Sequence, residues 1–203
     1  MITRYSEARL PTPHGDFRVV VYRTGQQAGE GATAVGLGAE EHIAMILGDV
    51  AGAGALARVH SSCFTGEVLG SQRCDCRAQL DAALARIGQE GRGVLVYLVQ
   101  EGRGIGLGNK VRAYQLQDEG HDTVEANLAL GFDADLRSYD LAAGILADLG
   151  VSSVRLMTNN PRKIAGLESA GVVVEAHESH WVPASEHSES YLAAKKNKLG
   201  HLA

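Results

Sequence analysis

The sequence predicts an α/β protein: a single domain with a mixed, partly parallel sheet and flanking helices. From Gln79 onward, segments with helical periodicity alternate with short runs of β-branched and large apolar residues, which is the pattern of parallel strands joined by helices. The first sixty residues instead hold short apolar runs between glycine-rich stretches, as hairpins do, and this makes the sheet mixed. A chain of 203 residues has the length of one such domain, so we assign residues 1–203 to it.

The first strands are predicted at Phe17–Tyr22, His42–Leu47 and Ala55–His60, where β-branched or large apolar residues lie between glycine-rich stretches. Between the first two of them, residues 24–40 are rich in glycine and alanine. A buried loop would leave its backbone polar groups without partners. We therefore expect this segment to be an exposed surface loop that carries no chemistry.

The first helix is predicted from Gln79, because apolar residues recur at helical spacing before Gly91, a residue type that often ends helices. Next, Val94–Val99 is apolar almost throughout, which indicates a central strand buried on both faces. Three more helices are predicted: one from Gly106 to Glu119, one capped by Ser138 that ends before Gly150, and one with Asn160 as its cap and Pro161 at its first position. Two more strands are predicted at Val154–Met157 and Val172–Glu175. The tail, residues 178–203, is expected to hold an amphipathic or frayed helix at Ser188–Leu199.

Composition excludes several classes of protein. Hydrophobic residues make up 45% of the chain and charged residues 21%, which is the usage of a folded globular protein. The net charge of -5 lacks the basic excess that general nucleic-acid binding needs. The longest strongly apolar runs, such as Val94–Val99, fall far short of the roughly 20 residues of a membrane-spanning helix, and Met1–Glu7 has no apolar signal core. We therefore expect a cytoplasmic protein with neither a membrane nor a nucleic acid as partner.

All three cysteines, Cys63, Cys74 and Cys76, form one C-x10-C-x-C pattern. An odd number of clustered cysteines fits a reducing compartment and a metal site better than a disulfide framework. Three thiolates can bind zinc and leave its fourth position to water, which is the arrangement of a catalytic site. Two alternatives stay open at this point: a closed structural site with His60 as the fourth ligand, and three unrelated buried thiols.

The pentapeptide Gln-Glu-Gly-Arg-Gly occurs twice, at residues 89–93 and 100–104. The first copy closes a predicted helix and enters a strand, as a capping turn does. The second copy leaves the carboxyl end of the predicted buried strand, where α/β sheets place ligand contacts. We therefore expect ligand contacts from the second copy.

The segment Arg58–Leu80, RVHSSCFTGEVLGSQRCDCRAQL, closely resembles the zinc segment of GTP cyclohydrolase II, the enzyme that opens GTP at the first step of riboflavin synthesis. The resemblance continues through Gln100–Leu107 (QEGRGIGL), Lys110–Gly120 (KVRAYQLQDEG), Asp122–Phe132 (DTVEANLALGF) and Thr158–Lys163 (TNNPRK). It implies one zinc ion per subunit on the three cysteines, a magnesium ion with the triphosphate, and a homodimer. It also implies hydrolysis of GTP to formate, pyrophosphate and 2,5-diamino-6-(ribosylamino)-4(3H)-pyrimidinone 5′-phosphate, with water activated on zinc as the nucleophile on C8 of guanine.

The resemblance also implies roles for the remaining site residues. Tyr114 would lie near the ring-opening chemistry, Asp135 would be a proton acceptor, and Arg137 a nucleophile toward the α-phosphorus. Because a guanidinium stays protonated, stabilisation of transition-state charge is a rival role for Arg137. Glu101 would accept from two adjacent N–H groups of guanine, which adenine cannot supply. The residues that match nucleotide contacts are Arg58, Val59, His60, Ser61, Ser62, Gln79, Glu101, Gly102, Arg103, Thr123, Thr158 and Lys163.

Several of these residues have a plainer interpretation. Tyr114 fits a core aromatic on an amphipathic helix, Glu101 a surface partner of Arg103, and Thr158–Lys163 an ordinary strand-to-helix turn. Ser62, Phe64 and Arg77 depart from the commonest wording of the family. Ser62 stands where glutamate usually precedes the first zinc cysteine, which removes a carboxylate from the surroundings of the metal. Two alternatives follow: a paralogue that gives a formamidopyrimidine product or uses another purine nucleotide, and a non-catalytic nucleotide-binding zinc module.

Overall fold

The computed structural model describes residues 2–24, 40–133 and 135–182. The expected surface loop, apart from its end residues Thr24 and Glu40, lies outside the described residues, as does the expected tail helix Ser188–Leu199. In the described part of the chain, no helix has both the length and the apolar character needed to cross a membrane.

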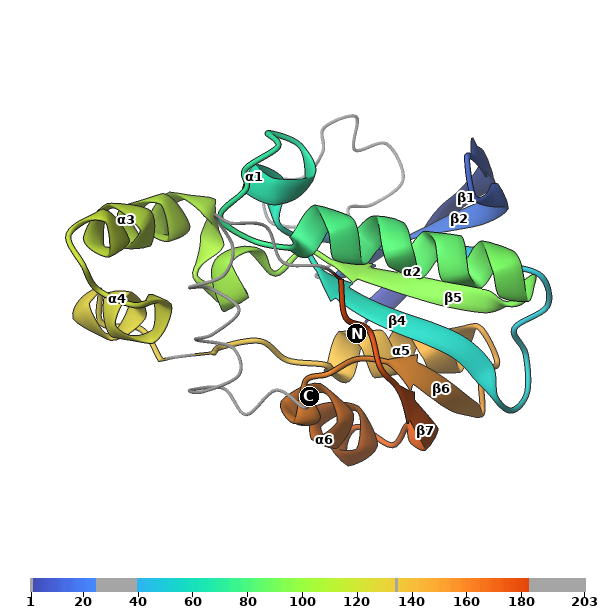
Figure 1. Ribbon diagram of the computed structural model, residues 1–203. Helices are drawn as coiled ribbons and strands as arrows, with labels where there is room; N and C mark the ends of the chain where they lie inside the picture. The colour runs from blue at the N-terminus through green and yellow to red at the C-terminus, as the bar shows by residue number, and fades with distance from the viewer. Residues whose placement is uncertain (1, 25–39, 134, 183–203) are drawn as a thin grey trace, which may run out of the picture.

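Seven strands of the described chain form one mixed sheet in the order β1-β2-β3-β5-β4-β6-β7 (Figure 1). The pairs from β1 through β2 and β3 to β5 are antiparallel, whereas those from β5 through β4 and β6 to β7 are parallel. The predicted fold class, α/β with a mixed sheet, is therefore confirmed. The strands are β1 Ile2–Thr12, β2 Gly15–Thr24, β3 Glu41–Leu47, β4 Ala55–Ser61, β5 Gly93–Leu98, β6 Ser153–Met157 and β7 Val173–Glu178.

Strand β1 is not predicted by the sequence. Its side chains are exposed along most of its length, so the segment has no apolar alternation, and Pro11 argues against a central strand. It forms because it pairs with β2 from Ile2 opposite Thr24 to Thr12 opposite Gly15. At the edge of a sheet such a strand needs hydrogen bonds on one side only, which is why a proline is tolerated there.

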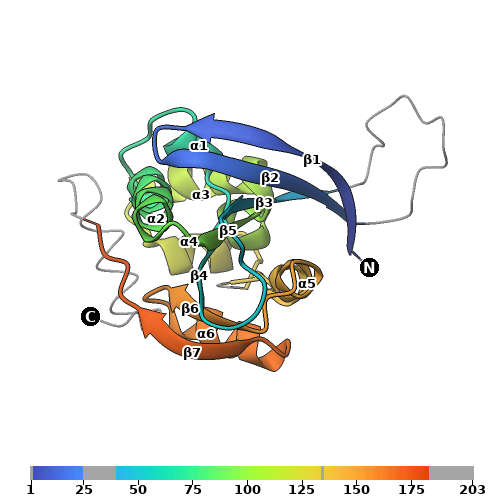
Figure 2. The ribbon, with the colours of Figure 1, turned by 90° about the vertical axis from the view of Figure 1, so that its right-hand side faces the viewer.

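Helices cover both faces of the sheet, with α2 on one face and α5 and α6 on the other (Figures 1 and 2). The sequence predicts α2, α3, α5 and α6 but neither α1 nor α4. Helix α2 begins three residues before the predicted start, and it ends as expected at Gly91, whose φ of 73° is the left-handed conformation that favours glycine. The helices of the described chain are α1 Phe64–Glu67, α2 Cys76–Glu90, α3 Gly106–Asp118, α4 Thr123–Ala129, α5 Asp140–Asp148 and α6 Pro161–Ser169, with a short 3-10 helix η1 Glu101–Gly104.

Of the two predicted helix caps, that of α6 is confirmed, whereas the N-cap residue of α5 is Tyr139 rather than Ser138. Asn160 Oδ1 accepts from the Arg162 N–H at 3.0 Å, and Pro161 occupies the first position of α6. Ser138 lies one residue before the N-cap of α5, and its Oγ accepts from the Asp140 N–H at 3.2 Å. The start of α6 follows β6 directly, so it fixes where the chain leaves the carboxyl end of that strand.

The alternation of β4 decides which side chains face the functional site. Ala57 and Val59 pack in the core cluster that includes α5 and α6, whereas Leu56 packs in the cluster that includes α2. Since side chains alternate along a strand, Arg58 and His60 also face the α2 side. Both are buried, at 5% and 3% exposure, and buried polar side chains require partners.

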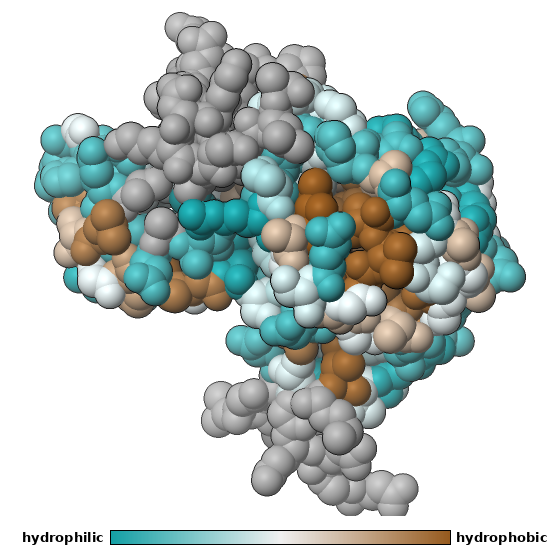
Figure 3. Space-filling view, turned by 90° about the horizontal axis from the view of Figure 1, so that it is seen from below, coloured by the Kyte–Doolittle hydropathy of each residue, from teal (hydrophilic) through white to brown (hydrophobic). Residues whose placement is uncertain are grey.

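Helices α3 and α4 pack on each other and form a lobe that projects beyond the sheet (Figure 1). Seen from below, the outline of the molecule narrows between this lobe and the main body (Figure 3). The carboxyl end of β4 points toward the lobe (Figure 1). The space between them is where an α/β sheet of this kind places its ligand.

Candidate active site

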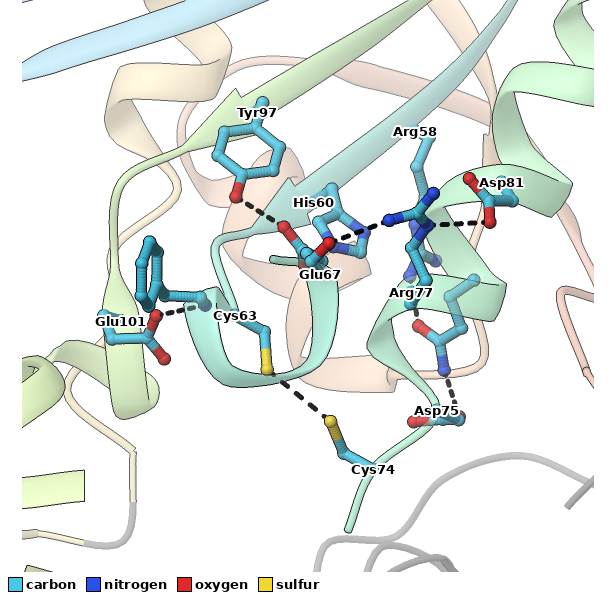
Figure 4. Close-up of polar contacts among 12 residues, drawn as sticks. Arg58, His60, Cys63, Glu67, Cys74, Asp75, Arg77, Asp81, Tyr97 and Glu101 are labelled. Carbon is cyan, nitrogen blue, oxygen red and sulfur yellow. Dashed lines mark hydrogen bonds and ion pairs between the residues drawn. The ribbon is translucent and has the colours of Figure 1, made fainter. Parts of the chain in front are cut away.

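The three cysteines form one cluster. Cys63 is the N-cap residue of α1, and Cys76 is the first residue of α2. Their sulfur atoms and that of Cys74 lie within 4.8 Å of one another, with Cys63 and Cys74 3.5 Å apart (Figure 4). Tetrahedral zinc with bonds of about 2.3 Å to sulfur needs sulfurs about 3.8 Å apart. The donor set and its spacing therefore fit zinc.

His60 does not belong to this cluster. Among the described residues the group of candidate ligands consists of the three thiols. The His60 Nε2 atom lies 2.7 Å from Glu67 Oε1 instead. Within the described ranges, the donor set is therefore that of an open site with three protein ligands, and His60 does not close it.

Gly66 leaves room for the thiols. A Cβ atom at this position would lie 2.9 Å from the Cys74 sulfur and 3.2 Å from the Cys63 sulfur. Carbon and sulfur do not approach so closely without displacement of one of them. The absence of a side chain at Gly66 is therefore what allows α1 to pack against the cluster.

Lys110 of α3 joins the cluster to Glu101. Its Nζ atom donates to the Cys63 sulfur at 3.1 Å and to Glu101 Oε1 at 2.6 Å. Burial acts to lower the pKa of Lys110, but Glu101 and Cys63 outweigh it and raise that pKa. The lysine charge is therefore present beside the thiols and offsets part of the negative charge of a three-thiolate site.

Both oxygens of Glu101 have donors in this structure. Oε2 accepts from the Phe64 N–H at 2.6 Å, and Oε1 accepts from the Gly102 N–H at 3.1 Å as well as from Lys110. Glu101 is thus paired with Lys110 rather than with Arg103, the partner expected for a surface glutamate. Gly102 and Arg103 both have φ of 62°, and a non-glycine residue in this left-handed conformation stores strain, as residues at functional sites often do.

Two buried cations line the cavity, Arg58 from strand β4 and Lys163 from helix α6. Arg58 donates to the Met157 carbonyl at 2.8 Å and to Gln79 Oε1 at 2.6 Å, while Gln79 Nε2 donates to Asp75 Oδ2 at 2.5 Å. Burial lowers the pKa of Arg58 to about 10, so it stays charged at neutral pH. Lys163 is also buried, and its Nζ donates to the Val59 carbonyl at 2.7 Å.

The cluster and these cations line one open cavity between the sheet and the α3–α4 lobe. Its empty volume is about 1250 Å³, counting the part that is open to solvent. The expected site residues in its wall are Arg58, His60, Ser61, Ser62, Cys63, Cys74, Cys76, Gln79, Glu101, Gly102, Arg103, Tyr114, Thr123, Arg137, Thr158 and Lys163. The fold therefore brings together nearly all the residues that the resemblance singles out.

Val59 and Asp135 lie outside the lining of this cavity. The Val59 side chain is buried in the core, as the alternation of β4 requires. Asp135 lines a neighbouring hollow and is bonded to Arg137, with Nε to Oδ1 at 2.8 Å and the terminal nitrogen to Oδ2 at 2.6 Å. Burial acts to raise the pKa of Asp135, but the hydrogen bonds and charge of Arg137 outweigh it and lower that pKa. In this structure Asp135 anchors the Arg137 guanidinium through two hydrogen bonds.

Tyr114 lies at the thiol cluster rather than in the core. Its hydroxyl is 3.1 Å from Thr65 Oγ1, which is itself 3.7 Å from the Cys63 sulfur. The side chain lines the cavity. The interpretation of Tyr114 as a core aromatic is therefore wrong.

Sequence reasoning overlooks several residues of the cavity wall. His180, for example, donates from Nε2 to the Gln79 carbonyl at 2.9 Å, and its backbone N–H donates to Asn159 Oδ1. No local pattern signals a contact between segments so distant in the chain. Asp75 could have been noticed from its place between two cysteines. The overlooked residues that line the cavity include Arg73, Asp75, Asn127, Asn159, Asn160, His180 and Trp181.

The fold and the site define an α/β protein with a three-thiol, metal-type centre at the carboxyl edge of parallel strands, beside a cavity with buried cations. The chain belongs to the GTP cyclohydrolase II family, whose model matches residues 3–179. The resemblance noted in the sequence is thereby confirmed, and the chain is a member of a hydrolase family.

Curated relatives match the whole chain. It is 54% identical over 203 residues to the riboflavin biosynthesis protein RibBA of Bacillus cereus, and 52% identical over 204 residues to the protein of the same name from Bacillus velezensis. The match covers 100% of this chain and 48% of each relative, so the chain spans about half the length of the curated relatives it matches. One solved structure resembles the chain: RibBX from A. baumannii, a two-domain 3,4-dihydroxy-2-butanone 4-phosphate synthase. The sequence identity is 21% and the TM-score is 0.46, and the match covers 88% of this chain and 40% of RibBX.

Proposed function

We propose that this chain is a zinc-dependent GTP cyclohydrolase II that hydrolyses GTP to formate, pyrophosphate and 2,5-diamino-6-(ribosylamino)-4(3H)-pyrimidinone 5′-phosphate in riboflavin synthesis. The observation that carries the proposal is the open three-thiol cluster in the wall of a cavity that also holds buried cations. Membership of the family and the 54% identity to a riboflavin biosynthesis protein support it.

Cys63, Cys74 and Cys76 would hold one zinc ion. Zinc with three protein ligands supplies a Lewis acid with one position open for activating water. Lys110 would offset the negative charge of the thiolates, since its Nζ lies 3.1 Å from the Cys63 sulfur. Tyr114, held near the cluster through Thr65, would orient the reacting part of the purine by its hydroxyl.

The triphosphate would bind at Arg58, Lys163 and Thr158, together with a magnesium ion. Arg58 and Lys163 are buried cations in the cavity wall, where charge acts at short range with little screening. Thr158 precedes the N-terminus of α6, a helix of nine residues whose terminal N–H groups favour anions. The Arg58 Nε atom is buried without a partner in the described structure, which leaves one donor for a ligand.

Guanine would be recognised by Glu101 and the residues around it. Its carboxylate can accept from the two adjacent N–H groups of guanine. Because its oxygens accept from Phe64, Gly102 and Lys110 here, binding of the base in this way would require some of these hydrogen bonds to be exchanged. The base site and the metal site would thus be coupled through Lys110.

Arg137 would stabilise the charge that develops on the α-phosphate, with Asp135 as its anchor. The two side chains form a two-point ion pair and are 14% and 9% exposed. An arginine so paired stays protonated, which favours charge stabilisation over nucleophilic attack.

The deciding experiment is to incubate the purified, zinc-loaded protein with magnesium and GTP, and to measure formate, pyrophosphate and the mass of the product. The proposal predicts formate and pyrophosphate in equal amounts. A product that retains its formyl group, with no free formate, would identify the formamidopyrimidine alternative, and tight GTP binding without turnover would identify a binding module. The zinc-stripped protein is the matched control.

We also propose a homodimer in a reducing cytoplasmic compartment, on the resemblance and on the clustered free cysteines. Light scattering on the zinc-loaded protein measures the mass directly. A monomer mass at enzyme concentrations that support turnover would remove the dimer from the proposal.

A further inference from the structure

The half-buried Tyr97 and the buried Glu67 and His60 form a hydrogen-bonded chain of side chains beside the thiol cluster (Figure 4). The Tyr97 hydroxyl donates to Glu67 Oε2 at 2.5 Å, and Glu67 Oε1 lies 2.7 Å from His60 Nε2. The side chains of His60 and Glu67 are 3% and 5% exposed, and the His60 and Tyr97 rings are stacked with centroids 5.7 Å apart. None of the roles assigned above uses Glu67 or Tyr97.

The chemistry of the chain fixes where its protons lie. Burial and the neighbouring Glu67 both raise the pKa of Tyr97, so the phenol keeps its proton and donates it. A carboxylate only accepts, so the proton between Glu67 and His60 belongs to Nε2 of the histidine. Burial lowers the pKa of His60, which keeps the ring neutral. The other nitrogen, Nδ1, is therefore an acceptor, and it is buried without a hydrogen-bond partner in the described structure.

The His60 ring is at the same time part of the cavity wall. It lies at the carboxyl end of β4, three residues before Cys63. A buried acceptor without a partner costs free energy in the empty protein. A bound ligand with an N–H or O–H group would remove that cost.

Glu67 also holds the loop that carries the cysteines. It is the last residue of α1, the helix that begins after Cys63, and its carbonyl oxygen accepts from Arg77 of α2 at 2.8 Å. Its side chain meanwhile bonds to β4 and β5. One residue therefore connects four elements around the site, and an apolar residue of the same size could make none of these side-chain hydrogen bonds.

We propose that Glu67, supported by Tyr97, is a positioning residue that locks His60 as the Nε2–H tautomer, so that Nδ1 accepts a hydrogen bond from an N–H or O–H group of the bound nucleotide. The binding half of this proposal rests on the proposed function, whereas the tautomer half does not. Glu67 itself does not touch the substrate.

The test compares the wild-type protein with Glu67→Gln and Tyr97→Phe, all zinc-loaded. Nitrogen-15 NMR of the histidine rings reports the tautomer, with the His60 signals identified by their loss in His60→Gln. Wild-type His60 should carry its proton on Nε2, and added GTP should shift its Nδ1 resonance. In Glu67→Gln the amide can present either its C=O or its NH2 group, so the lock is lost and the Nδ1-protonated form should appear. Tyr97→Phe leaves the carboxylate in place and should keep the wild-type tautomer.

Turnover gives the second readout. Glu67→Gln should lower kcat/KM by about tenfold or more, the loss expected for one hydrogen bond to a substrate, and Tyr97→Phe by clearly less. If NMR shows that His60 of the wild-type protein is protonated on Nδ1, the proposal is wrong, and no variant is needed to show it. The proposal is also wrong if Glu67→Gln keeps the wild-type tautomer of His60, because any loss of activity in that variant would then be structural. If the wild-type protein does not turn over GTP at all, the proposed function fails, while the tautomer measurement still decides the role of Glu67.

Discussion

Replacement of Gly66 by alanine is the sharpest test of the metal centre. The added Cβ would meet the Cys74 sulfur at 2.9 Å and the Cys63 sulfur at 3.2 Å, where ordinary contacts begin at 3.4 Å. At least one sulfur must therefore move by several tenths of an ångström. Metal–ligand distances tolerate only about 0.2 Å, so we expect Gly66→Ala to weaken zinc binding.

The magnitude follows from the cost of overpacking, which is about 1–3 kcal/mol. At about 1.4 kcal/mol for each factor of ten, zinc should bind about 5- to 140-fold more weakly. The zinc-free protein should keep its stability, because alanine is favoured over glycine in helices by up to about 1 kcal/mol. Competition with a chromogenic chelator measures the zinc affinity, and thermal unfolding of the metal-free protein measures the fold.

Gly108→Ala is the matched control. Gly108 lies in α3, and a Cβ there would meet nothing within 4 Å. This variant should bind zinc as the wild type does and be slightly more stable. Equal zinc affinities for Gly66→Ala and Gly108→Ala would refute the packing argument for the thiol cluster.

Three further predictions concern the chemistry. Cys76→Ser should bind little zinc and release no formate, yet it should still release pyrophosphate with GMP as co-product. Arg137→Ala should suppress pyrophosphate release while zinc stays bound. If Cys76→Ser loses both products but still binds the nucleotide, ring opening and phosphate cleavage are not independent. Glu101→Gln should cost about 2 kcal/mol or more in kcat/KM for GTP, and an unchanged preference for GTP over ATP would contradict its role at the base. Trp181, the one tryptophan of the chain, lines the cavity at 41% exposure, so GTP should change the intrinsic fluorescence; no change at saturating GTP would exclude the nucleotide from this cavity.

Local sequence patterns were sufficient to predict those elements whose own residues determine their structure. Strand β5 is predicted because it is apolar throughout, and α6 because Asn160 and Pro161 mark its start. The metal-type cluster is predicted from the short sequence spacing of the three cysteines, whose sulfur atoms lie within 4.8 Å of one another. In each case the physical cause, burial, capping or ligand chemistry, acts through residues close in the chain.

Elements that depend on a partner could not be predicted in this way. Strand β1 has no apolar face and exists because β2 supplies its hydrogen bonds. Helix α4 is short and packs on α3, so its seven residues offer too few turns for a periodic signal.

The residues and spacing of the chain thus determine an α/β fold, a three-thiol site and its family. The tertiary structure alone decides which charges face the site and what each one touches. It places Lys110 between Glu101 and Cys63, and it joins Glu67 of α1 to Tyr97 of β5. The contacts of Lys110 with Cys63 and of Glu67 with Tyr97 cross wide gaps in the sequence. Hydrogen bonds and ion pairs depend on distances of a few ångströms, and only the packing of the helices against the sheet sets those distances.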